Sequence, residues 1–142
     1  MRHPRPVLLA CLLAVLVAAL PASAQDVPPP AAPRLSAFIV GKLRGPGAGV
    51  RAACSAGCDI KGTIKVTYNL RVFLRLKSRT VGKGKGHLDG AGLIDVLVAL
   101  DNSAIHAVKK RHGNQLPVRL EATATDTDGR TTKLTKRLKI PL

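Results

Sequence analysis

The stretch Cys58-Asp-Ile-Lys-Gly-Thr-Ile-Lys-Val-Thr-Tyr68 decides the fold class of this chain. Apolar side chains at Ile60, Ile64, Val66 and Tyr68 share one side of an extended backbone, and lysines and threonines occupy the other side. A period of two residues is typical of a β-strand with one buried and one solvated face. The stretch therefore predicts a strand with one solvated side.

Further strands are expected along the rest of the chain. Short apolar or alternating runs, separated by turn residues, lie at 35–40, 50–54, 79–88, 93–100, 116–125 and 130–140. The last two runs form a hairpin around residues 126–129, and residues 41–49 form a loop. Residues 69–77 stay open, because their pattern fits a strand and also a helical turn. About seven strands separated by frequent turns predict an all-β fold, a single β-sandwich.

The glycine-rich segment Gly82-Lys-Gly-Lys-Gly86 lies inside one of these runs. It lacks the spacing of a phosphate-binding loop, and no helix is expected after it. We therefore predict an edge strand whose lysines face water and discourage pairing with other molecules.

One short helix is expected near residues 102–112. Polar residues at 101–103 can cap its start, and Gly113 can end it in the left-handed conformation. Lys109, Lys110 and Arg111 would fall in its last turn, near the negative end of the helix dipole.

The N-terminus predicts export. Residues 1–24 form a signal peptide, in which Arg2 and Arg5 precede a long apolar run that ends in small residues. A proline-rich leader follows at 25–33, and a single domain at 34–142. Removal of the signal lowers the formal net charge from +15 to +13. We expect a secreted, extracellular protein that is cell-wall associated and has no membrane span in its mature chain.

Cys54 and Cys58 form the cysteine pair of the mature chain, because Cys11 leaves with the signal. A turn of three residues that includes Gly57 can bring them to bonding distance, and the exported location favours a disulfide. Two alternatives are a redox centre, which usually uses C-x-x-C, and a zinc site, which needs four ligands. The histidines show no spacing that completes such a site, so we expect no metal.

Catalytic residues and cofactors are not expected either. Asp101, Ser103 and His106 lie close in sequence but belong to a helix cap and its first turns. Asp126-x-Asp128-Gly129 resembles the start of a calcium loop, yet it lacks the later glutamate and suits a hairpin turn.

Basic residues recur on the solvated side of several expected elements. Those we expect to bind polyanions are Lys61, Lys65, Lys83, Lys85, Lys109, Lys110, Arg111, Lys133, Lys136 and Arg137. Such a surface attracts an anionic cell-wall polymer or polysaccharide. Specific nucleic-acid recognition is not expected, because aromatic residues that could stack on bases make up 2% of the chain. Solubility alone is the competing explanation of the charge.

Several motifs in order resemble a known group of modules. They are Val50-Arg51, Cys54-Ser55, Cys58, 81–85, the helix before Gly113, and 122–129. Over residues 50–140 the chain resembles the immunoglobulin-like or fibronectin-like β-sandwich modules of secreted and surface proteins from high-GC Gram-positive bacteria. The resemblance implies an immunoglobulin-like fold, a bridged cysteine pair and a non-enzymatic accessory role. The proline-rich leader and the extra strand at 35–40 depart from the usual pattern.

The leading hypothesis is therefore a secreted, non-enzymatic binding or structural module that associates with anionic polymers of the cell envelope or extracellular space. The alternatives are a small metal-dependent protein or enzyme of unrecognised type, and an adaptor for one protein partner, which the sequence does not identify.

Overall fold

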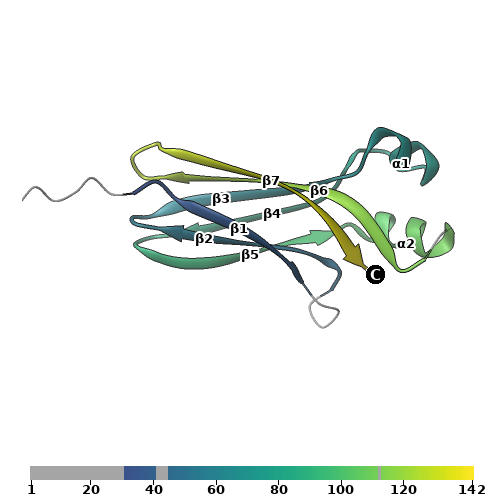
Figure 1. The fold of residues 1–142 in the computed structure, drawn as a ribbon, viewed down its shortest axis with the longest axis horizontal. Helices are drawn as coiled ribbons and strands as arrows, with labels where there is room; N and C mark the ends of the chain where they lie inside the picture. The colour runs from purple at the N-terminus through teal and green to yellow at the C-terminus, as the bar shows by residue number, and fades with distance from the viewer. Residues whose placement is uncertain (1–30, 41–44, 112) are drawn as a thin grey trace, which may run out of the picture.

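Strands dominate the computed structural model, which describes residues 31–40, 45–111 and 113–142. The all-β prediction is confirmed, with two short helices at the same end of the strands (Figure 1). The elements are β1 (Arg34–Val40), β2 (Gly47–Cys54), β3 (Cys58–Lys65), α1 (Tyr68–Phe73), β4 (Thr80–Leu88), β5 (Gly92–Leu100), α2 (Asn102–Arg111), β6 (Gln115–Asp126) and β7 (Thr131–Pro141). The expected signal at 1–24, the leader up to residue 30, loop residues 41–44 and His112 lie outside the described residues.

The strands form one antiparallel sheet in the order β1-β2-β5-β4-β3-β6-β7. The sheet folds over on itself, so that β1, β2 and β5 form one layer and β3, β6 and β7 form the other. Its two edge strands approach each other, and Nζ of Lys136 in β7 lies 3.5 Å from the carbonyl oxygen of Ala37 in β1. This arrangement is compatible with the expected sandwich, although its two layers stay joined through β4.

The core lies between the two layers. A Cβ atom added to Gly62 in β3 would lie 2.6 Å from Cγ2 of Val98 in β5, so the two strands touch across the interior. The largest fully buried side chains belong to Ile60, Ile64, Leu116, Leu120, Ile140, Val50, Val66 and Val98. Each of these side chains contributes about 1.5–3 kcal/mol through burial. The alternation predicted after Cys58 is confirmed through β3 and as far as the buried Val66.

The glycines of β4 allow the sheet to bend between its layers. A Cβ on Gly82 would lie 2.4 Å from the carbonyl oxygen of Ala99, and one on Gly84 would lie 2.4 Å from that of Leu97. A larger residue would therefore push the β5 backbone away. The prediction of an edge strand was wrong, since β4 is the central strand of the sheet. Its lysines do face water, as expected.

Residues 69–77, whose pattern fitted both a strand and a helical turn, contain most of helix α1, which begins at Tyr68. The Thr67 side chain accepts a hydrogen bond from the Leu70 amide at 3.3 Å and caps the start of the helix. Tyr68, which the strand period placed on the buried side, is 60% exposed instead. That placement was wrong because β3 ends at Lys65 and the helix turns Tyr68 outward.

The second helix agrees with its prediction. Helix α2 buries Ala104 and Val108, and Gly113 follows it with a φ of +116°. The hairpin of β6 and β7 is also confirmed, with the apolar positions of β6 buried. The expected loop at 41–49 is shorter than predicted, because β2 already begins at Gly47.

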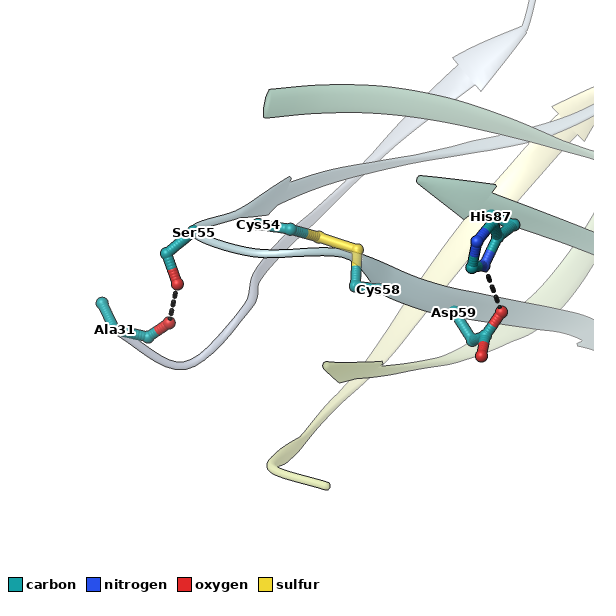
Figure 2. Close-up of a disulfide and its surroundings, with 6 residues drawn as sticks. All are labelled: Ala31, Cys54, Ser55, Cys58, Asp59 and His87. Carbon is teal, nitrogen blue, oxygen red and sulfur yellow. Dashed lines mark hydrogen bonds and ion pairs between the residues drawn. A yellow bond between two sulfur atoms is a disulfide. The ribbon is translucent and has the colours of Figure 1, made fainter. Parts of the chain in front are cut away.

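The disulfide between Cys54 and Cys58 is confirmed and joins the end of β2 to the start of β3 (Figure 2). The two Cα atoms lie 6.3 Å apart. Because β2 and β3 belong to different layers, the bond ties the layers together at the end opposite the helices. Next to it, the Ser55 hydroxyl donates a hydrogen bond to the Ala31 carbonyl at 2.7 Å.

Candidate anion-binding face

The outward side of β4, β3, β6 and β7, here called the basic face, gathers most of the expected binding residues. Because alternate side chains of these strands enter the core, the remaining ones all point to solvent. The cations on this face are Lys61, Lys65, Lys83, Lys85, Arg119, Lys133, Arg137 and Lys139. Its carboxylates are Asp59 and Glu121, and threonines fill most of the other outward positions.

Strand register sets like charges directly against each other on this face. Lys65 of β3 pairs with Arg119 of β6, and Arg119 pairs with Arg137 of β7. Lys61 is likewise opposite Lys85 of β4. Directly opposed like charges destabilise a sheet, since their Cβ atoms are about 4.5–5.5 Å apart. These rows therefore weaken the fold unless an anion lies over them.

One carboxylate partly compensates this charge. Nζ of Lys65 lies 2.6 Å from Oε2 of Glu121, and both side chains are a little over one-third exposed. Within the described part of the chain, Arg119, Arg137 and Lys139 have no ion-pair partner. The positive charge is thus concentrated toward the α1 end of the face.

A hollow of about 550 Å³ lies at that end of the basic face. Its lining comes from β3, α1, the segment before β4, and the β6–β7 pair. The lining residues are Lys65, Val66, Thr67, Tyr68, Arg79, Pro117, Val118, Arg119, Glu121, Arg137, Leu138 and Lys139. We call this hollow the arginine pocket. Nε of Arg79 donates to the Val66 carbonyl at 3.3 Å, which ties that guanidinium group to the rim.

The remaining expected binding residues lie elsewhere. Lys109, Lys110 and Arg111 occupy the last turn of α2, where the Arg111 guanidinium donates to the Phe73 carbonyl at 2.9 Å and lies over the Phe73 ring. Lys136 lies on the inward side of β7, facing β1. These cations do not join the basic face.

Sequence reasoning left Arg79, Arg119 and Lys139 out of the expected binding set. The alternation of residues 116–125 already placed Arg119 opposite the apolar positions of its strand. What it lacked was the register that sets Arg119 between Lys65 and Arg137. That register joins strands far apart in sequence, so the pocket has no local sequence signal.

His87 lies at the disulfide end of the basic face, with its ring beside the Asp59 carboxylate (Figure 2). Its Nδ1 is 2.7 Å from Oδ1 of Asp59, and its Nε2 is 3.0 Å from Oδ1 of Asp89. Hydrogen bonding to Asp59, and then to Asp89, raises the pKa of His87 above its usual value of 6.5. The histidine thus adds positive charge to this end at mildly acidic pH.

The Asp126 carboxylate is engaged by hydrogen bonds from within its own turn. The Asp126 carboxylate accepts from the Arg130 amide at 2.8 Å, from the Arg130 Nε at 2.8 Å and from the Asp128 amide at 3.0 Å. Burial opposes its ionisation, but the bonds from Arg130 outweigh burial and lower the pKa of Asp126. These hydrogen bonds agree with a hairpin turn at Asp126.

In residues 31–40, 45–111 and 113–142, no cluster of three or more histidine, cysteine or acidic residues could hold a metal ion.

The three residues considered for hydrolysis all lie exposed at the start of α2. Asp101 contributes its carbonyl oxygen, which accepts hydrogen bonds from the amides of Ala104 and Ile105. Ser103 and His106 face solvent on the helix. This position fits the start of a helix.

The outward side of β1, β2 and β5, here called the apolar face, has a different character. Phe38 packs over Gly49, with Leu97 next in the same row, and Leu93 is 69% exposed. Apart from Arg34 at the start of β1, its charged residues form a closed pair, in which Arg51 donates two hydrogen bonds to Asp95 at 2.7 and 2.8 Å.

No helix in the described residues combines the length and apolar character that a membrane crossing requires. No family model matches the chain, and neither a curated protein nor a solved structure matches it.

Proposed function

We propose that this chain is a secreted, non-enzymatic binding module that associates with anionic polymers of the cell envelope or extracellular space through its basic face. The observation that carries the proposal is the pair of like-charge rows, Lys65–Arg119–Arg137 and Lys61–Lys85. Each row costs stability in the free protein and would be relieved by a bound polyanion.

The layout of the face favours a polymer over a small ion. Cations lie on all four strands, which are about 4.8 Å apart, and neighbouring cations are about 6.8 Å apart at Lys83–Lys85 on β4 and at Arg137–Lys139 on β7. A chain with one negative charge per unit can contact several of them together. The resemblance to immunoglobulin-like modules supports an accessory role by analogy of fold.

Threonines between the lysines add hydrogen-bond donors and acceptors, as at Thr63 and Thr123. No phenylalanine, tyrosine or tryptophan occupies an outward position of these four strands, which does not suit stacking on a run of bases. A polysaccharide or wall polymer therefore fits better than a nucleic acid.

Retention on a polyanion resin, measured against salt concentration, tests the proposal. We expect the mature protein to elute well above about 0.15 M salt, because each contact releases counterions. Elution at or below that concentration would overturn polymer binding.

A matched pair of variants separates a specific face from total charge. The variant K61Q/K85Q removes two charges from the basic face, and K109Q/K110Q removes two from α2. We expect the first to elute at clearly lower salt than the second. Equal elution of the two variants would mean that net charge alone causes retention.

A further inference from the structure

The arginine pocket differs chemically from the rest of the basic face. Away from the pocket the face carries lysines, at Lys61, Lys83, Lys85 and Lys133. The pocket adds three arginines, Arg79, Arg119 and Arg137, to two lysines of its own, Lys65 and Lys139. Lysine acts as a mobile point charge, whereas the planar guanidinium group binds a carboxylate or phosphate through two parallel hydrogen bonds. The pocket thus suits one oriented oxyanion.

Two of these arginines are placed to act together. Arg119 and Arg137 are direct register partners on β6 and β7, so both guanidinium groups start from neighbouring backbone positions on one face. The carboxylate in the pocket, Glu121, is engaged by Lys65 at 2.6 Å. Neither arginine forms an ion pair within residues 31–40, 45–111 and 113–142.

Other lining groups point to a sugar rather than a bare anion. Tyr68 lines the pocket and is 60% exposed as a residue, and the Arg71 guanidinium carbon lies over its ring, 5.2 Å from the centroid. An exposed aromatic ring can pack against the C–H face of a pyranose. The Glu121 carboxylate can accept hydrogen bonds from sugar hydroxyls. The volume of about 550 Å³ is within the usual range for ligand pockets.

We infer that the arginine pocket binds one acidic sugar unit, with its carboxylate or phosphate on Arg119 and Arg137, its ring against Tyr68 and its hydroxyls on Glu121. This inference rests on the proposed function and narrows the polymer to an acidic glycan. The basic face attracts the polymer, and the pocket recognises a single unit.

Calorimetric titration of the mature protein with short sugars at 0.15 M salt tests the inference. The probes are trigalacturonate, glucose 1-phosphate, inorganic phosphate and a neutral trisaccharide. Binding of trigalacturonate alone assigns the carboxylate source, and binding of glucose 1-phosphate alone assigns the phosphate source. The inference is overturned if neither charged sugar binds, or if the neutral sugar or inorganic phosphate binds equally well.

A charge-conserving variant distinguishes failure of the pocket from failure of the proposed function. R119K/R137K keeps both charges but loses the planar forks, so we expect about a tenfold loss of affinity for the charged sugar with unchanged retention on the polyanion resin. K61Q/K85Q should show the reverse pattern. Wild-type sugar affinity in R119K/R137K would overturn the pocket assignment and leave polymer binding by the face intact.

A second substitution tests the ring contact. We expect Y68A to weaken the charged sugar several-fold and Y68F to bind like wild type, because stacking needs the ring and not the hydroxyl. Thermal unfolding of every variant checks that the fold is kept. Equal binding by Y68A and wild type would contradict the sugar assignment.

Discussion

The basic face and the apolar face cover the same core and differ in how they treat charge. On the apolar face Arg51 and Asp95 satisfy each other through two hydrogen bonds. On the basic face Lys65, Arg119 and Arg137 are set in one row, with a single carboxylate beside them. Both faces are outward sides of one sheet, so the fold does not impose the difference. A charged side chain in an ion pair contributes to the stability of the protein itself. A charged side chain without such a pair remains available to bind a ligand of opposite charge.

The largest expected effect is a loss of stability on substitution in the core that both faces share. Ile64 is fully buried between the layers, whereas its neighbour Thr63 points outward on the basic face. I64A should lower the free energy of unfolding by about 3 kcal/mol, because it removes buried methyl groups and leaves a cavity. Denaturant unfolding measures this loss, with T63A as the control. Similar losses in I64A and T63A would contradict the inward and outward assignment.

The next effect concerns the covalent link between the layers that carry the two faces. C54S/C58S removes the disulfide and should cost about 2 kcal/mol of stability, because a five-residue loop is no longer closed in the unfolded chain. Chemical denaturation with and without reductant measures it. Reductant should destabilise the wild type and leave C54S/C58S unchanged. An equal response in both proteins would argue against the bridge in solution.

A smaller effect should have opposite signs on the two faces. R119T removes the central cation of the like-charge row, and we expect it to stabilise the protein by about 0.5 kcal/mol at low salt. R51A breaks the two hydrogen bonds between Arg51 and Asp95 and should slightly destabilise the protein. Thermal unfolding at low and high salt measures both changes. Destabilisation by R119T would show that the row is not under electrostatic strain.

The smallest effect is a pH dependence at the disulfide end of the basic face. Because the folded pKa of His87 is raised, its charged form stabilises the protein fully below the unfolded pKa of about 6.5, and this contribution is lost as pH rises through the folded value. NMR titration of the imidazole should give a pKa above 6.5 that falls in D59N. An unchanged pKa in D59N would contradict the hydrogen bond to Asp59.

The sequence predicted the parts of both faces that depend on local pattern. Alternation placed Ile60 and Ile64 inside and Lys61 and Lys65 outside, because a strand reverses its side chains at every residue. Turn and capping residues likewise predicted α2 and the hairpin before β7. These features depend only on neighbours along the chain.

What could not be predicted depends on contacts between distant segments. The central place of β4 follows from close approach of its glycines to the β5 carbonyls, which no local pattern reveals. Tyr68 continues the alternating pattern of β3 by chance. It belongs instead to the first turn of α1, whose start is capped by Thr67. The arginine pocket needs the register of three strands at once, so its residues look like ordinary surface charges in the sequence.

The position of Lys136 affects how copies of this protein behave toward each other. It occupies an inward position of β7, between Leu134 and Leu138, at the seam where the two edge strands meet. A charged side chain at such a position discourages an incoming strand from another molecule, since pairing would bury the ammonium group. The seam thereby disfavours strand-to-strand association of copies, which the proposed binding of many copies along one polymer would otherwise promote.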